Sequence, residues 1–326
     1  MQPETMDSIV VDVTSTREDQ HIILIVGPTA SGKSELALRL AESVTGEIVN
    51  ADSMQFYKGM EIGTARPSAA YMSRVPHHLF GIVTPDVNFT AADYISAAGQ
   101  AITDICRRGR IPIVVGGTGL YVRALLCGLA ESPPADEVYR AELTHYGEQF
   151  GPRALHDRLA QVDPVSAARL HVNDRLRIIR ALEVFHQSGI PFSALQQTHG
   201  FMESRYEALK IGLDVERGLL YERIDRRVDE MIAAGLVDEV EGLLSEGYSP
   251  ALKAMGAIGY RELCNCFAGK ITLSEAVSLI KKNTRHYAKR QLTWFKKDTE
   301  IIWFEYPEYF ANINRIACDF IHRRRL

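Results

Sequence analysis

The chain lacks any run of about eighteen apolar residues, the length that a helix needs to cross a membrane, so we predict no membrane span. Residues 1–20 also lack the basic start and the long apolar core of a secretory signal peptide. They are polar and mostly acidic, with one short apolar stretch at residues 9–11, and we expect a flexible leader. These absences indicate a cytoplasmic protein.

Cysteine is scarce, and the five that occur have no paired spacing, which argues against a disulfide framework and for a reducing compartment. Cys264 and Cys266 are separated by one residue, too few for a zinc knuckle, and no later Cys/His pair completes a metal site. We therefore predict that both are small core residues. A net charge of −4 argues mildly against a nucleic-acid partner, although an average can conceal a basic patch.

The strongest pattern lies at residues 22–42. A β-branched apolar run, residues 22–26, predicts a buried strand, and apolar residues at helical spacing follow from Leu36 onward. Between them lies a segment that fits the phosphate-loop pattern G-x-x-x-x-G-K-[ST], and the strand before it and helix after it meet that pattern's context test. The segment consists of Gly27, Pro28, Thr29, Ala30, Ser31, Gly32, Lys33 and Ser34.

Such a loop turns its backbone N–H groups toward a phosphate, and the helix N-terminus adds partial positive charge. Lys33 supplies a point charge for a terminal phosphate, and the Ser34 hydroxyl is placed to bind Mg²⁺. The loop therefore predicts a ligand with a diphosphate, but it does not specify a reaction.

Four further apolar runs, separated mostly by helical stretches, predict an α/β fold with a mainly parallel, doubly wound sheet. They are residues 47–50, 111–115, 210–213 and 301–304. In such sheets ligands bind at the carboxyl ends of the strands. The glycine-bearing loops at residues 51–67 and 116–121 should therefore converge on the phosphate loop.

Residues 131–204 differ in character, because prolines interrupt the pattern and no strand-like run follows until Lys210. Helical segments fill this gap at residues 153–161 and 173–187, the second with Asn173 as its predicted cap. We therefore predict a leader (1–20), a core domain (21–130 and 205–326) and an all-helical insertion (131–204).

The C-terminal third contains one strongly basic helix. Residues 272–275, Thr-Leu-Ser-Glu, form a capping box that predicts its start. Between Val277 and Lys297 no acidic residue occurs, whereas a solvated helix face normally mixes both signs. This one-sided charge favours a polyanionic partner.

The residues alone leave the chemistry open. Asp52 follows the second strand and could ligate Mg²⁺, accept a proton from a nucleophile, or cap a turn. Thr118 could hold a nucleophile or phosphate by its hydroxyl, and Arg285 could neutralise a leaving diphosphate. His77 and His78 are predicted to be structural loop residues. The sequence has few of the accessory motifs that ATP hydrolysis needs. One apolar run ends in Asp214, but it is short and lies far along the chain. The loop could therefore bind a diphosphate other than ATP.

At this point several motifs together resemble the tRNA dimethylallyltransferase family, whose fold is a P-loop NTPase-like sheet with a helical insertion. They are residues 27–34, 50–53, 57–67, 76–79, 113–121, 173–174, 180–184, 257–261 and 285–294. The resemblance implies transfer of a dimethylallyl group from dimethylallyl diphosphate to N6 of adenosine 37 in tRNA, with Mg²⁺ as cofactor. It also implies that the insertion grips the anticodon stem-loop. We expect a monomer.

The resemblance also implies residue roles. Asp52 matches the general base, while Lys33, Arg285 and Ser34 with Mg²⁺ would stabilise the leaving diphosphate. Thr118 and Arg140 match positions that contact tRNA. Further implied tRNA contacts are Asp52, Ser53, Met54, Gln55, Leu176, Arg177, Ile178, Ile179, Arg180, Gly256, Ala257, Ile258, Gly259, Tyr260 and Arg261.

Two other hypotheses remain. One is a small-molecule transferase, either a P-loop kinase or an enzyme that prenylates a free adenine nucleotide; the basic helix and the insertion disfavour it. The other is a non-catalytic, nucleotide-gated RNA-binding module, which Asp52 and Thr118 at strand ends disfavour.

Overall fold

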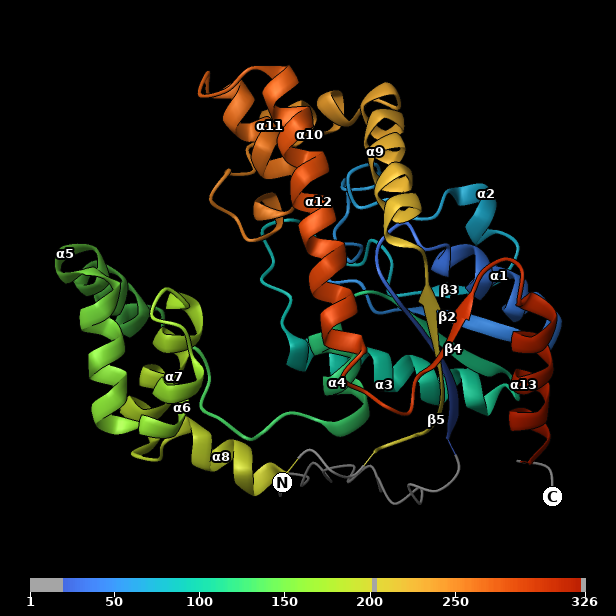
Figure 1. Cartoon of the computed structure of the whole chain (residues 1–326), viewed down its shortest axis with the longest axis horizontal. Coiled ribbons are helices and arrows are strands. Elements are labelled where there is room, and N and C mark those ends of the chain that lie inside the picture. The colour runs from blue at the N-terminus through green and yellow to red at the C-terminus, as the bar shows by residue number, and fades with distance from the viewer. Residues whose placement is uncertain (1–19, 201–203, 324–326) are drawn as a thin grey trace, which may run out of the picture. The chain divides into compact units, whose positions relative to one another are not determined.

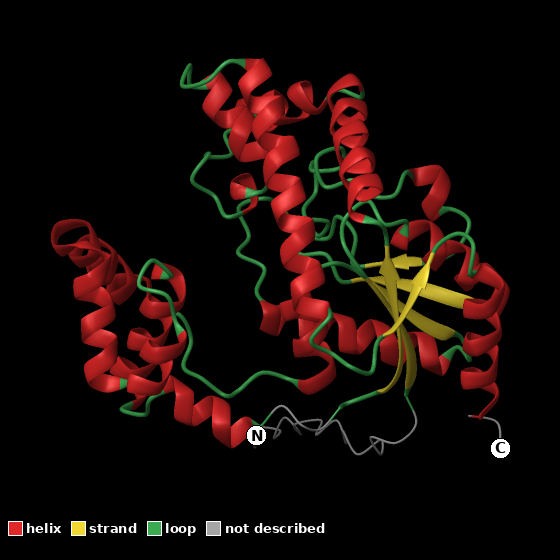
Figure 2. Cartoon of the chain, viewed as in Figure 1, coloured by secondary structure: helices red, strands yellow, loops and turns green. Residues whose placement is uncertain are grey.

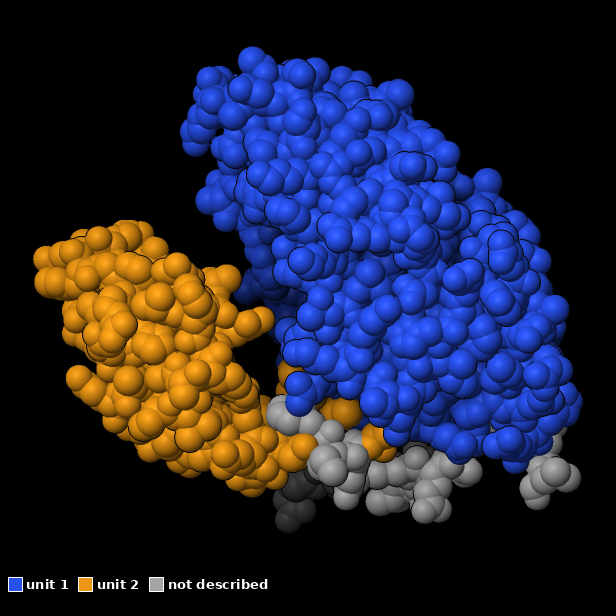
Figure 3. Space-filling model, viewed as in Figure 1, with its two compact units in different colours: residues 1–126, 205–326 blue, residues 127–204 orange. Residues whose placement is uncertain are grey.

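A computed structural model describes residues 20–200 and 204–323. Residues 1–19 of the predicted leader lie outside the described residues. The chain divides into two compact units, one formed by residues 1–126 and 205–326 and the other by residues 127–204 (Figure 3). The predicted insertion, residues 131–204, falls within the second unit, residues 127–204.

The first unit contains a parallel sheet (Figure 1). For the described residues it has six strands, in the order β3-β2-β4-β1-β5-β6. Every pairing is parallel, so the predicted α/β fold is confirmed. The strands are β1 (His21–Val26), β2 (Gly46–Asn50), β3 (His77–His78), β4 (Ile111–Val115), β5 (Glu207–Asp214) and β6 (Ile302–Glu305).

One strand corrects the sequence analysis. His77 and His78 were expected in a loop, yet they form β3 and pair with Ile48 and Val49 of β2. His78 also approaches Glu47 at 2.7 Å from its Nε2 atom to the carboxylate. A strand of two residues offers no alternation that a sequence pattern could detect.

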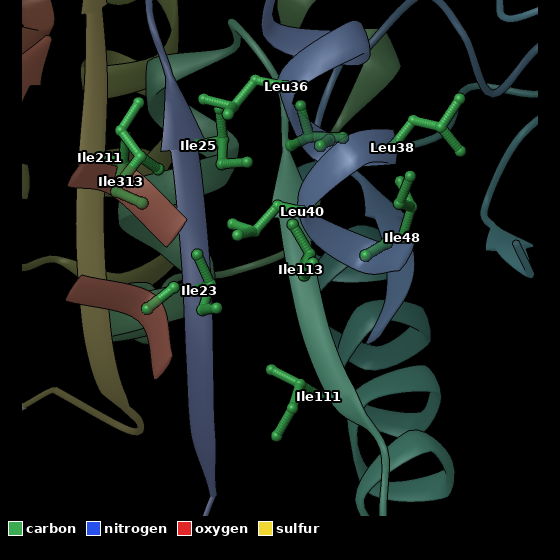
Figure 4. Packing of buried hydrophobic residues seen from close by; sticks show 14 of the residues in the cluster. Ile23, Ile25, Leu36, Leu38, Leu40, Ile48, Ile111, Ile113, Ile211 and Ile313 are labelled. Carbon is green, nitrogen blue, oxygen red and sulfur yellow. The ribbon is translucent and has the colours of Figure 1, made fainter. Parts of the chain in front are cut away.

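The first unit also contains helices, several of which pack against the sheet (Figure 2). They are α1 (Lys33–Val44), α2 (Ala69–Met72), α3 (Ala91–Arg107), α4 (Gly119–Cys127), α9 (Arg217–Ala233), α10 (Leu236–Ser245), α11 (Tyr260–Phe267), α12 (Leu273–Phe295) and α13 (Phe310–His322), with a 3-10 turn at Ala254–Gly256. On one face, Ile23 and Ile25 of β1 pack with apolar residues of α1 and α13 (Figure 4). This packing fixes the start of α1 against the end of β1.

A second cluster joins α10, α11 and α12 to the segment after β2, through Tyr57 and Met60. Cys264 and Cys266, which were predicted to be core residues, pack partly buried against it. The predicted capping box is confirmed, because Thr272 caps α12 and Glu275 bonds back to the Thr272 backbone. This cluster places α12 beside the loops that follow the strands.

The helical unit has its own core, built around Leu155, Leu159 and Ile178. Its helices are α5 (Glu137–Val162), which kinks at Gly151, α6 (Pro164–Arg169), α7 (Arg175–Ser188) and α8 (Phe192–His199). The N-cap of α7 is Asp174, one residue after the predicted Asn173. Among the described residues of both units, no helix is both long and apolar enough to span a membrane.

Candidate active site

The phosphate loop connects β1 to α1, as predicted. Gly32 caps α1 with φ +95°, a left-handed conformation that favours glycine, and this turn directs the chain into the helix. The loop is tied down from elsewhere, because the Thr29 N–H donates to the Gln291 side chain of α12 at 2.8 Å. Lys33 Nζ donates to the Pro28 carbonyl at 2.6 Å, so its ammonium lies over the loop.

Asp52 lies just beyond the end of β2. Buried Asn50 holds it, accepting from the Asp52 N–H at 2.8 Å and donating to the Asp52 carbonyl at 3.1 Å. The Asp52 carboxylate in turn accepts the Met54 N–H at 3.0 Å. The carboxylate therefore caps a turn, and one oxygen remains available for other contacts.

The charges of Lys33 and Asp52 influence each other. Burial lowers the pKa of Lys33 to about 7; the Asp52 carboxylate opposes this shift, and Arg227 adds to it. Burial raises the pKa of the Asp52 carboxyl above its usual value, although the Met54 N–H, Lys33 and Arg227 all pull it down. Burial thus favours the uncharged form of both groups.

Two cavities meet at these residues. A smaller one lies over the phosphate loop and is lined by Lys33, Ser34 and Gln55 among others. A larger one of about 330 Å³ extends toward α11 and α12. Four residues line both: Thr29, Asp52, Thr64 and Arg227. A carboxylate at the junction of a phosphate-binding cavity and a second cavity can act on two substrates at once.

Arg227 of α9 is a site residue that the sequence analysis missed. It lines both cavities, and burial lowers the pKa of its guanidinium, an effect that the Asp52 charge opposes. It lies in a run of charged residues, 222–230, where no local pattern distinguishes it. The predicted cation, Arg285, lines neither cavity; its guanidinium pairs with Asp225 of α9 at 2.5 Å. Arg227 therefore lines the phosphate-loop cavity, whereas Arg285 does not.

Most of the predicted tRNA contacts in the first unit gather in the larger cavity. Its lining includes Ser53, Met54, Gly256, Ala257, Ile258, Gly259 and Arg261, together with Tyr287 and Arg290 of α12. Gln55 lines the smaller cavity instead, and Tyr260 is fully buried. Thr118 lines neither cavity. Its hydroxyl accepts the Ser53 N–H at 3.0 Å and so supports the turn that holds Asp52.

The remaining predicted contacts lie in the helical unit. Ile178 and Ile179 are buried in its core, so their side chains are not available to RNA, which corrects that expectation. Arg140 and Arg180 both bind the buried carboxylate of Glu183, at 2.8 and 2.5 Å. Two other predicted contacts face solvent: Leu176 is 83% exposed, and the Arg177 side chain pairs with Asp174 at 2.9 Å.

Acidic side chains of other elements balance part of the positive charge of the basic helix, α12, and of the residue that follows it. Lys281 pairs with Asp229, and Lys296 pairs with Asp214 at the end of β5. Lys289 and Arg290 are exposed, and Arg290 also lines the larger cavity. Lys282 and Lys297 are exposed as well, so several positive charges of this stretch remain accessible, and Arg290 is the one among these that lines the larger cavity.

The site's donors fit Mg²⁺ bound together with a diphosphate. The Ser34 residue is exposed beside the cavity, and hydroxyl and phosphate oxygens are the hard ligands that Mg²⁺ prefers. Within residues 20–200 and 204–323, no group of three or more His, Cys, Asp or Glu side chains could hold a metal ion. Ser34 and oxygens of the ligand are donors that could hold Mg²⁺ here.

The parallel sheet, the phosphate loop after β1 and the carboxylate after β2 define a P-loop type protein with a second cavity beside its phosphate site. The sequence profile of the IPP transferase family matches residues 55–298, and that of isopentenyl transferase matches residues 20–78. The chain therefore belongs to the IPP transferase family.

Similar proteins agree with this assignment. The tRNA dimethylallyltransferase of Geobacter sulfurreducens is 60% identical over 299 residues, covering 92% of this chain and 96% of that protein. The crystal structure of the tRNA isopentenylpyrophosphate transferase of Bacillus halodurans is 40% identical with a TM-score of 0.71, covering 94% and 98% of the two chains. A eukaryotic dimethylallyltransferase studied acting on tRNA is 27% identical with a TM-score of 0.76, covering 94% and 80%.

Proposed function

We propose that this protein transfers the dimethylallyl group of dimethylallyl diphosphate to N6 of adenosine 37 in tRNA. The observation that carries this proposal is the position of Asp52, which lines both the phosphate-loop cavity and the larger cavity. A prenyl transfer needs such a junction, because the donor's allylic carbon and the acceptor's amine must meet at one point. The names of its relatives support the same reaction.

In the proposed reaction the donor diphosphate binds in the smaller cavity and the flipped adenine enters the larger one. The N6 atom attacks C1 of the donor, forming an N–C bond while the C1–O bond breaks. Diphosphate leaves with the bonding electron pair, and Asp52 accepts the N6 proton. The raised pKa of Asp52 favours this role, since a base works best when its pKa is near the operating pH.

Charge on the departing diphosphate is stabilised by Lys33, Arg227 and the N-terminus of α1, all of which face the phosphate-loop cavity. Mg²⁺ held by Ser34 would add Lewis-acid stabilisation of the same charge. We do not assign this role to Arg285, because its guanidinium pairs with Asp225. The tRNA is proposed to contact the larger cavity and the exposed cations of α12, and the helical unit through Leu176 and Arg177.

The reaction can be tested directly. The protein is incubated with Mg²⁺, dimethylallyl diphosphate and an unmodified tRNA that carries adenosine 37, without ATP. The tRNA is then digested to nucleosides, which are identified by mass spectrometry. We expect N6-dimethylallyladenosine. tRNA binding without product would contradict the proposal, and a tRNA with guanosine at position 37 is the control. In parallel incubations, prenylation of added AMP or phosphate transfer from added ATP, with no prenylated tRNA formed, would also contradict it.

A further inference from the structure

The segment of residues 61–65 lies between the two cavities. Gly63, Thr64 and Ala65 line the larger cavity, and Thr64 also lines the smaller one. The segment consists of turns and bends outside any helix or strand. The segment forms turn hydrogen bonds of its own, from the Ala65 N–H to the Ile62 carbonyl and from the Arg66 N–H to the Glu61 carbonyl, and other elements also bind its backbone.

One side chain binds three successive N–H groups of this segment. Glu239, in the first turn of α10, accepts the N–H groups of Glu61 at 2.9 Å, Ile62 at 2.7 Å and Gly63 at 3.1 Å. The same carboxylate accepts the Tyr260 hydroxyl at 2.5 Å. An ionised carboxylate has about four acceptor positions and no donor, so this arrangement uses it fully.

Two further contacts fix the segment on its other sides. Gln55 Nε2 donates to the carbonyls of Thr64 at 3.0 Å and Ala65 at 3.3 Å. The Tyr260 ring lies against Gly63 so closely that a Cβ atom there would be 2.5 Å from a ring carbon. Glu239 thus binds the N–H groups at the start of the segment, and Gln55 binds the carbonyls at its end. Tyr260 leaves no room for a side chain at Gly63.

We propose that Glu239 is a positioning residue for the transfer reaction, acting through residues 61–65, an inference that rests on the proposed function. Glu239 lines neither cavity, so it does not contact the reacting atoms. Thr64 lines both cavities together with Asp52. A displacement of residues 61–65 would therefore change the positions of the bound donor and of the bound acceptor together. Charge-assisted hydrogen bonds to a carboxylate hold such a wall more firmly than neutral ones.

The test variant is Glu239→Gln, which keeps the side chain's shape but turns an NH₂ donor toward backbone N–H donors. We expect kcat to fall roughly 10- to 100-fold, because small misplacements of reacting groups have effects of this size. The KM values for donor and tRNA should both rise, measured well below the variant's melting temperature. Glu241→Gln, an exposed carboxylate on the same helix, is the matched control and should match the unmodified protein.

A second measurement does not depend on activity. Hydrogen exchange at the amides of residues 61–63 should become faster in Glu239→Gln and stay unchanged in Glu241→Gln. If Glu239→Gln does not fold, Tyr260→Phe replaces it; this variant removes one of the four bonds and should change kcat and both KM values in the same direction, by less.

Unchanged kcat, KM values and amide exchange in a folded Glu239→Gln or Tyr260→Phe variant would overturn the inference, and so would a lowered melting temperature with unchanged kinetics. If the unmodified protein forms no prenylated tRNA, the proposed function fails instead. The two failures are therefore distinguishable.

Discussion

Replacing Asp52 by asparagine removes the proposed base while keeping the turn that holds it. The asparagine oxygen can still accept the Met54 N–H, which lies 3.0 Å from the Asp52 carboxylate, and Asn50 still holds the backbone. General-base catalysis contributes typically about 10²- to 10⁴-fold to a rate. The kcat of Asp52→Asn should fall by this factor, which corresponds to about 3–5 kcal/mol of transition-state stabilisation.

The same substitution should change how donor binding depends on pH. The ammonium form of Lys33 binds the diphosphate, so donor affinity is lost as pH rises through the Lys33 pKa of about 7 in the free protein. The Asp52 charge raises that pKa, and its removal lowers it further. In Asp52→Asn the loss of affinity should therefore occur at lower pH than in the unmodified protein.

Single-turnover prenylation at saturating donor and tRNA measures the first effect, and calorimetric titration of the donor on both sides of neutral pH measures the second. Asp86→Asn, the same substitution at an exposed aspartate that lines neither cavity, is the control. An unchanged single-turnover rate in Asp52→Asn would refute the assignment of the base. A pH profile of donor binding that does not move would refute the coupling between Asp52 and Lys33.

Four other substitutions have defined outcomes. Arg227→Gln should weaken donor binding and lower kcat/KM, together by roughly 10- to 100-fold, since hydrogen bonds to charged groups contribute about 1.5–3 kcal/mol; equal kinetics in steady-state assays would exclude it from the site. Lys33→Ala should weaken donor binding as well as rate, and unaltered affinity in a titration would argue against the phosphate loop as the donor site. Gln291→Met leaves the Thr29 N–H and the Gly117 carbonyl without their partner, so the melting temperature should fall by an amount equivalent to about 1–3 kcal/mol, and an unchanged melting curve would contradict this. The double charge reversal Lys289→Glu with Arg290→Glu should raise KM for tRNA. The slope of log affinity for tRNA against log salt concentration should also become shallower, by roughly 0.7–0.9 for each phosphate that the two cations neutralise. An unchanged slope would show that this surface does not bind RNA.

The parts of the site that follow strands could be predicted from sequence, because their signals are local. The phosphate loop has a fixed spacing, and the carboxyl-end rule for parallel sheets then brings Asp52 toward it. The capping box of α12 is equally local. These features needed no knowledge of packing between distant elements.

The missed features depend on tertiary contacts. Arg227 lines both cavities because of how α9 packs, whereas Arg285 of α12 pairs with Asp225 of α9. Ile178 and Ile179 were among the tRNA contacts that the resemblance implied, although both are buried in the core of the helical unit. Glu239 is one acidic residue among many in the sequence, and only the fold reveals the three N–H groups that it binds.

A structure of the protein with Mg²⁺, an unreactive donor analogue and a tRNA anticodon stem-loop tests the central claim most directly. We predict diphosphate oxygens within hydrogen-bond distance of Lys33 and Arg227, and adenine N6 about 2.6–3.2 Å from the Asp52 carboxylate. A diphosphate bound away from residues 27–34, or an adenine whose N6 lies beyond reach of Asp52, would contradict it.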